Sequence, residues 1–393
     1  MPSPTATATP VFSQGPIPSV PIAPAGGWTG FRWVAGPTMQ VPTPSDSVGA
    51  PNFAVFGWSR GYLGFRSADN GPDASGNLVL SVTTTHSTDG LHWQQGKGLD
   101  TTLAAGEVNG VGSVVEGPAG LLATGAAGGC GTPRWIGALW FSTDGLSWQQ
   151  LDMTKIFGQG VQILQVSAGS SGYIATGTAA RAGAQGVAWV ARDGRTWRPV
   201  SFSAPAFKNS VVNDGTAFAG GYVLAGAVYG QAGACGSPPL LTPSLWWSAD
   251  GTRWTRDSLS GTTSGTDVQM SVCRVDDGVL LAIQDAYGGN GTDTQAVWTS
   301  TDGQNWKLIK APAISETEVL TNGQRGLVVQ GLDQDGKMTI LGFDHDLALV
   351  TLPQTGDVPT DPANQTSVTL GPTGLVVANL DGSRFWVGVP RAG

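Results

Sequence analysis

Charged residues are scarce in this sequence, and lysine and histidine are scarcer still. Asp, Glu, Lys and Arg make up 12% of the 393 residues, six residues are lysine and three are histidine. Binding a phosphate backbone requires clustered cations, so the net charge of −8 argues against nucleic acid as a partner. With so few histidines and no Cys-x-x-Cys pair, we expect no metal site and no cofactor.

Long apolar runs are also lacking. No stretch approaches the roughly 20 residues that a membrane-spanning helix needs, so we expect no membrane insertion. No segment after residue 27 combines helical apolar spacing with a helix-forming composition, which argues against long helices. Glycine, proline and tryptophan are abundant instead, with 59, 25 and 15 copies. This composition is typical of many short strands joined by tight turns.

The first 27 residues are rich in Pro, Ser, Thr and Ala and contain no charged residue. Such a composition predicts an extended stalk or linker. The segment has no apolar core of a secretory signal. We therefore expect an exported bacterial protein, extracellular or at the cell surface, whose signal or anchor lies upstream of Met1.

A marker of the form Ser-x-Asp-Gly-x-x-Trp recurs five times, with Ala in place of Ser in the third copy. Successive copies are 49 to 57 residues apart, a period that suits one four-stranded propeller blade. In a turn, Asp accepts hydrogen bonds from backbone amides and Gly takes a positive φ. We assign structural roles to the Asp and Trp of each copy: Asp89 and Trp93, Asp144 and Trp148, Asp193 and Trp197, Asp250 and Trp254, Asp302 and Trp306.

Each repeat also contains a glycine followed by a short apolar run, which predicts a buried second strand. Seven such runs occur, beginning at Gly61, Gly120, Gly172, Gly221, Gly278, Gly326 and Gly374. Each marker then lies between the third and fourth strands of its repeat. The sequence therefore predicts an all-β, seven-bladed propeller of four-stranded antiparallel blades over residues 28–393.

The two chain ends are predicted to share one blade. The seventh repeat ends after its third strand, and Gly30-Phe-Arg-Trp33 matches the sequence that opens the fourth strand after Gly90. We expect residues 28–38 to complete the last blade and leave no open sheet edge. This assignment makes Arg32 a strand residue rather than a ligand.

At these residues the sequence resembles the Asp-box, or bacterial neuraminidase repeat, propellers, which include sialidases and non-catalytic receptors and assembly factors. The usual box has one residue between Asp and Gly, and here Gly follows Asp directly. The resemblance covers residues 28 to 390. It implies that the box lies on the face away from the ligand site, so it predicts the fold and not an activity.

A sialidase-like site would need an arginine cluster, a Tyr activated by Glu, and an Asp acid/base. The sequence contains only four glutamates. The candidates for a carboxylate pair at the mouth of the central channel are expected on the connections that lead into first strands: Glu107, Asp267, Glu316 and Glu318. Solvated loop acids explain the same residues, and sequence spacing does not decide between these readings.

Long connections after the second strands are the favoured recognition surface, because binding residues usually lie on loops held by a rigid scaffold. We expect Arg66, Arg134, Tyr229 and Tyr287 in or near them. The leading hypothesis is a non-catalytic exported propeller that binds a protein or a glycan through its loop face. The alternatives are a sialidase-like glycoside hydrolase and an assembly or scaffold factor in a larger complex.

Three cysteines allow at most one internal disulfide. Cys130 and Cys235 stand in two similar loop sequences, whereas Cys273 lies in a strand-like segment. Cys235 is one repeat away from Cys273, and Cys130 is two repeats away. We therefore expect a disulfide, if one forms, between Cys235 and Cys273.

Overall fold

The structure is a computed structural model. It describes residues 28–37, 52–72, 78–99, 108–127, 136–179, 186–230, 239–276, 279–287, 293–309, 315–321, 327–332, 338–343, 349–359, 365–379 and 382–392. The predicted stalk, residues 1–27, lies outside this set.

The described strands form seven sheets, numbered here in chain order. Sheet 1 contains β2 (Asn52–Trp58), β3 (Gly61–Pro72), β4 (Leu78–Ser87) and β5 (Gln94–Gln95). Sheet 2 contains β6 (Val108–Gly117), β7 (Gly120–Ala127), β8 (Ile136–Ser142) and β9 (Gln149–Gln150). Sheet 3 contains β10 (Val161–Gly169), β11 (Gly172–Ala179), β12 (Val187–Ala191) and β13 (Arg198–Pro199).

The remaining sheets follow the same order. Sheet 4 contains β14 (Ser210–Phe218), β15 (Gly221–Tyr229), β16 (Leu241–Ser248) and β17 (Thr255–Asp257). Sheet 5 contains β18 (Asp267–Asp276), β19 (Val279–Tyr287), β20 (Asp293–Ser300) and β21 (Lys307–Ile309). Sheet 6 contains β22 (Ser315–Thr321), β23 (Leu327–Leu332), β24 (Met338–Phe343) and β25 (Leu349–Thr351). Sheet 7 contains β27 (Gln365–Gly371), β28 (Gly374–Asn379), β29 (Phe385–Ala392), β1 (Trp28–Ala35) and β26 (Gln354–Gly356).

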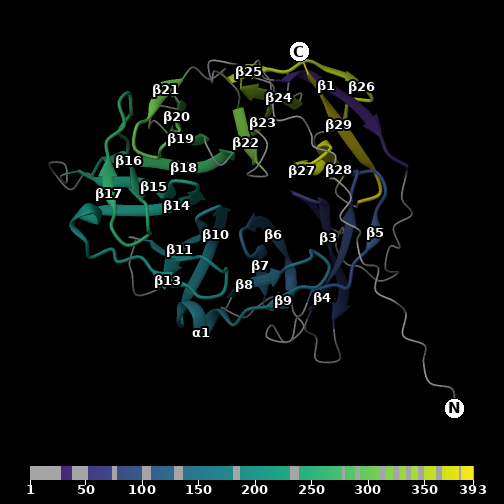
Figure 1. Ribbon diagram of the computed structural model, residues 1–393, viewed down its shortest axis with the longest axis horizontal. Coiled ribbons are helices and arrows are strands. Elements are labelled where there is room, and N and C mark those ends of the chain that lie inside the picture. Colours follow the sequence, from purple (N-terminus) through teal and green to yellow (C-terminus); the bar gives the residue numbers. More distant parts are fainter. Residues whose placement is uncertain are drawn as a thin grey trace.

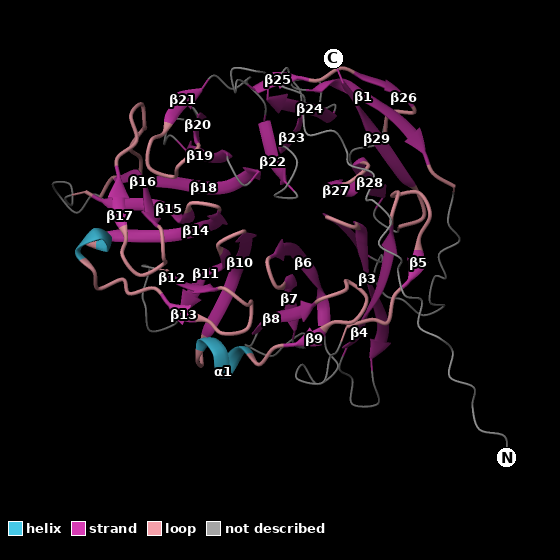
Figure 2. Cartoon of the chain, in the orientation of Figure 1, coloured by secondary structure: helices cyan, strands magenta, loops and turns pink. Residues whose placement is uncertain are grey.

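Helices are short in the described part of the chain. They are α1 (Met153–Phe157) and the 3-10 helix η3 (Pro205–Phe207), which lie in the connections between successive sheets (Figure 2). The predicted all-β class is confirmed, and sheets 1 to 6 each have the predicted four antiparallel strands.

Sheet 7 joins the two ends of the described chain. The sequence predicted that its N-terminal segment pairs with the last repeat, and β1 does pair antiparallel with β29, with Trp28 opposite Ala392. A fifth strand was not predicted. β26 pairs in parallel with β1, and the Trp33 indole Nε1 donates to the Gln354 side-chain oxygen at 2.9 Å. The segment that leaves sheet 6 is therefore attached to the outer edge of β1.

The sheets are arranged in a circle, with the first strands toward the middle and the fourth strands β5, β13, β17 and β21 on the outside (Figure 1). The first strand of each sheet contacts the first strand of the next, from β2 through β6, β10, β14, β18 and β22 to β27. β27 of sheet 7 in turn contacts β2 of sheet 1.

The hydrophobic core is divided among the spaces between neighbouring sheets. Phe65 of sheet 1 and Trp148 of sheet 2 belong to one cluster, with their rings edge to face and 5.5 Å between centroids. Third-strand tryptophans are the largest buried side chains, and Trp140, Trp246 and Trp298 are fully buried. Large aromatic side chains bury much apolar area and pack in preferred edge-to-face or offset arrangements. Sheet-to-sheet packing therefore stabilises the fold.

Tyrosines that follow the second-strand glycines connect neighbouring sheets. Tyr62, Tyr173 and Tyr222 are buried. Their hydroxyls donate at 2.8 Å to carbonyls in or next to the turn between first and second strands of the preceding sheet: Gly374, Gly120 and Ser171. The ends of the sheets that carry these turns therefore adjoin one another. We call this side, which also carries the markers, the turn face, and the opposite side the loop face.

Candidate functional site

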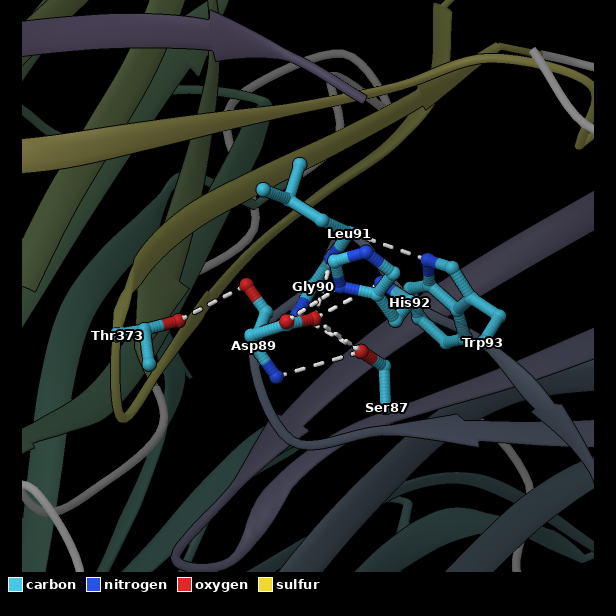
Figure 3. Close-up of polar contacts among 7 residues, drawn as sticks. All are labelled: Ser87, Asp89, Gly90, Leu91, His92, Trp93 and Thr373. Carbon is cyan, nitrogen blue, oxygen red and sulfur yellow. Dashed lines mark hydrogen bonds and ion pairs between the residues drawn. The ribbon is translucent and has the colours of Figure 1, made fainter. Parts of the chain in front are cut away.

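The marker forms a closed hydrogen-bonded turn between the third and fourth strands. In the first copy, the Ser87 hydroxyl accepts from the Gly90 amide at 2.8 Å, and Asp89 Oδ1 accepts from the amides of Leu91 and His92, both at 2.8 Å (Figure 3). The Trp93 indole donates back to the Gly90 carbonyl at 3.1 Å. Gly90 has a φ of +77°, a backbone conformation that residues with a side chain rarely adopt.

The aspartate part of this turn is present in all five copies, whereas the third copy has Ala191 in place of the serine and the Trp254 indole of the fourth copy has no hydrogen-bond partner among the described residues. The aspartate accepts from the two following amides in every copy, and the five glycines have φ values between +67° and +77°. Burial opposes ionisation, but hydrogen bonds from His92 and Leu91 lower the pKa of Asp89 to about 2. Such an acid is ionised near neutral pH and has no proton to donate. The marker carboxylates therefore stabilise turns.

The loop face contains three of the residues predicted to be functional. Asp267 is the first residue of β18, is exposed, and lies opposite Tyr287, the last residue of β19. Tyr229 is the last residue of β15 and is half-buried, and its amide donates to the Asn209 carbonyl at 2.7 Å. These residues occupy the corresponding ends of sheets 4 and 5.

Three other candidates lie in strands rather than on connections. Arg66 is inside β3, opposite Phe53 and Thr83, and is half-buried. Glu316 and Glu318 belong to β22, where the register shifts between Ser315 and Glu318. The assignment of Glu316 and Glu318 to a connection was wrong, because β22 begins before both residues and contains a bulge. Glu107 and Arg134 lie outside the described residues.

Cys273 is a free thiol in β18. Cys235, its predicted disulfide partner, lies outside the described residues, so this pairing stays a prediction. Burial, and next the negative charge of Asp214, raise the pKa of the Cys273 thiol well above its ordinary range.

Asp214 is the most strongly buried acid in the described part of the chain, and it was not among the predicted residues. Its carboxylate joins sheets 4 and 5: Oδ1 accepts from the Gly215 amide at 2.5 Å and Oδ2 from the Val272 amide of β18 at 2.8 Å. Burial raises its pKa to about 7, although both amide hydrogen bonds lower it. The sequence feature that could have revealed this buried acid is its position within the apolar strand SVVNDGTAF.

Two acids occupy the same register position in first strands. Asp214 lies opposite Ala225, the fourth residue after Gly221, and Glu318 lies opposite Gln330, the fourth residue after Gly326. A register shift immediately precedes each of them. Bulges re-aim side chains and are frequent near functional sites. Sheets 4 and 6 thus share an acidic position that sequence spacing alone does not reveal.

Asp257 is a second acid that sequence reasoning missed. It ends β17, and its Oδ2 is buried without a hydrogen-bond partner. Burial, and then the charge of Asp302 in the marker of sheet 5, raise the pKa of Asp257 to about 6. The two carboxylates lie on the outer side of the circle, away from the loop face. Among the described residues, no group of three or more His, Cys, Asp or Glu side chains is placed to hold a metal ion.

Comparison with known proteins adds only distant similarity. No family model and no curated protein match the chain. Among solved structures, it is similar to the Hadza microbial sialidase Hz136, at 13% identity and a TM-score of 0.38, over 87% of this chain and 66% of that one. It is also similar to an exo-β-1,3-galactanase from Clostridium thermocellum, at 11% identity and a TM-score of 0.37, over 92% and 87% of the two chains.

A glycosyl hydrolase from Bacteroides ovatus has 13% identity and a TM-score of 0.30, over 77% of this chain and 94% of that one. TM-scores and identities at this level assign neither a fold nor an activity to this chain. None of the helices in the described ranges is long and apolar enough to cross a membrane.

Proposed function

We propose that the chain is a closed seven-bladed β-propeller of the Asp-box type whose loop face binds a protein or a glycan without catalysing a reaction. Support for the closed ring comes from the contacts between successive first strands, which return from β27 to β2, and from the pairing of β1 with β29. The same proposal locates the protein outside a bacterial cell or on its surface, with residues 1–27 as a stalk.

The observation that carries the binding function is the separation of the two faces. On the turn face, the marker carboxylates are held by the amides of their own turns. On the loop face, Tyr229 and the exposed Asp267 come from different sheets and lie at strand ends. Side chains presented in this way by a rigid scaffold are typical of recognition surfaces.

A glycan array and an affinity capture from the culture medium test this proposal with the full chain. We expect a specific ligand whose binding falls at least fivefold in Asp267→Ala, while the matched variant Asp357→Ala, an exposed acid in the linker after β26, binds normally. Capture of a stable multi-protein complex instead of a single ligand supports the scaffold alternative. Equal binding by both variants contradicts the assignment to the loop face.

Hydrolysis is tested separately with fluorogenic glycosides, including a sialoside. The non-catalytic proposal expects no turnover above the buffer rate. Turnover that is lost in Glu318→Gln and kept in Asp357→Ala overturns the proposal in favour of a glycoside hydrolase.

A further inference from the structure

Five arginines are concentrated on the outside of two neighbouring sheets. They lie in the markers and fourth strands of sheets 3 and 4, all are exposed, and we call them the arginine rim: Arg192, Arg195, Arg198, Arg253 and Arg256. The chain has 20 lysines and arginines and a net charge of −8, so a quarter of its cations lie in the markers and fourth strands of two adjacent sheets. The fourth strands β13 and β17 are neighbours on the outside of the circle (Figure 1).

None of these arginines forms an ion pair within the described residues, where the one ion pair joins His92 and Asp89. Two of them contact neighbouring sheets in other ways. The Arg195 guanidinium lies over the Phe141 ring of sheet 2, 4.1 Å from its centroid. Arg198 donates from Nη2 to the Asp250 carbonyl in the marker of sheet 4 at 2.8 Å. These two contacts place the rim between the edge of sheet 2 and the marker of sheet 4.

Two of the positive charges act on the Tyr222 hydroxyl. Burial raises the pKa of Tyr222, and the charges of Arg192 and Arg198 oppose that rise. Both guanidiniums therefore lie within electrostatic range of the Tyr222 hydroxyl, at the junction of sheets 3 and 4. A cluster of exposed cations without ion-pair partners favours the binding of an anion.

The acids among these arginines restrict the spacing of charges on a ligand. Asp193 and Asp250 lie in the same two turns, and Asp257 ends β17. DNA carries one negative charge per about 1.7 Å of helix axis, so some of its phosphates would lie next to these carboxylates and be repelled by them. A polymer with one anionic group per sugar unit has wider spacing and avoids them. Guanidinium groups bind carboxylates and sulfates through two parallel hydrogen bonds, and all five cations of the rim are arginine.

We propose that the arginine rim binds an anionic polysaccharide that carries carboxylate or sulfate groups along a linear chain. This site lies on the turn side of the molecule and is independent of the loop-face ligand. The polymer runs along the rim from the edge of sheet 2 to sheet 4.

The test compares wild type with Arg192→Gln/Arg195→Gln/Arg253→Gln, which keeps the structural bond of Arg198. The matched control is Lys97→Gln/Lys155→Gln/Lys208→Gln, which removes three exposed cations that do not belong to the rim. Binding of the full chain is measured on immobilised polygalacturonate, dextran sulfate, neutral dextran, poly-glutamate and double-stranded DNA. Each measurement is repeated at low and at physiological salt.

We expect wild type to bind one or both anionic polysaccharides, and not neutral dextran, with affinity that falls as salt rises. The rim variant should bind about tenfold more weakly or worse, and the lysine variant within twofold of wild type. Carboxylate and sulfate sources are distinguished by which of the two polysaccharides binds more tightly. Absence of binding, equal weakening in both variants, or tighter binding to poly-glutamate or DNA overturns the proposal.

Discussion

Replacement of Asp214 by asparagine should remove a pH dependence of stability from the junction of sheets 4 and 5. Asp214 is 6% exposed, and its carboxylate receives amide hydrogen bonds from both sheets. Its pKa is raised from 3.8 to about 7 by burial. Because the folded state therefore binds more protons than the unfolded state between those values, the free energy of unfolding falls as the pH rises from about 4 to about 7.

The size of the effect follows from the two pKa values. The difference between 3.8 and about 7 corresponds to roughly 4 kcal/mol, lost progressively across that pH range. The asparagine side chain of the variant cannot ionise, but its NH₂ group faces an amide donor, which costs the variant about 1 to 3 kcal/mol at every pH. The variant should therefore be less stable than wild type near pH 4 and equally or more stable near pH 8.

Guanidinium chloride unfolding of both proteins from pH 4 to pH 8 measures this difference. Asp267→Asn is the matched control, because Asp267 is exposed at the start of β18 and its replacement should leave the pH profile unchanged. Parallel profiles for wild type and Asp214→Asn would refute the reasoning, as would an Asp214 carboxyl that titrates near pH 4 by NMR.

Three further predictions concern the marker, the tyrosines and the free thiol. Asp144→Ala removes the acceptor of two turn amides, and we expect a loss of about 1 to 3 kcal/mol in unfolding free energy; Asp357→Ala should have little effect, and an equal loss in both would count against the turn. Tyr173→Phe removes the hydroxyl that joins sheet 3 to the turn of sheet 2, and thermal unfolding should show a loss of about 0.5 to 1.5 kcal/mol; an unchanged Tm would contradict this link. Because the pKa of Cys273 is raised, iodoacetamide should modify it slowly in the native state and rapidly after unfolding, as followed by mass spectrometry; equal rates would show that the thiol is not protected.

The sequence predicted those parts of the fold that depend on neighbouring residues in the chain. The Ser87–Trp93 turn could be predicted because its donors, acceptors and positive-φ glycine all lie within seven residues. The second-strand tyrosines could be placed in the core because they follow a repeated glycine and apolar run. Local hydrogen-bonding chemistry is therefore sufficient to find the five marker turns.

The missed features depend on contacts between sheets. The buried carboxylate of Asp214 accepts a hydrogen bond from the strand amide of Val272, 58 residues away. No residue near Asp214 in the sequence indicates this partner. The parallel pairing of β26 with β1 joins residues more than 300 positions apart. Glu318 was assigned to a connection because a bulge breaks the alternation by which a strand is recognised.

The pairing of β1 with β29 has a mechanical consequence. Trp28 lies opposite Ala392, so both ends of the described chain leave from the same end of an antiparallel pair. A force that pulls these two ends apart loads the hydrogen bonds of the pair one after another, as in a zipper, and not all at once. β26 lies along the other edge of β1, and its parallel pairing at Phe31 and Trp33 holds β1 when the bonds to β29 have opened. Under tension the molecule should therefore yield first at β1–β29, in small steps, while the other sheets remain folded.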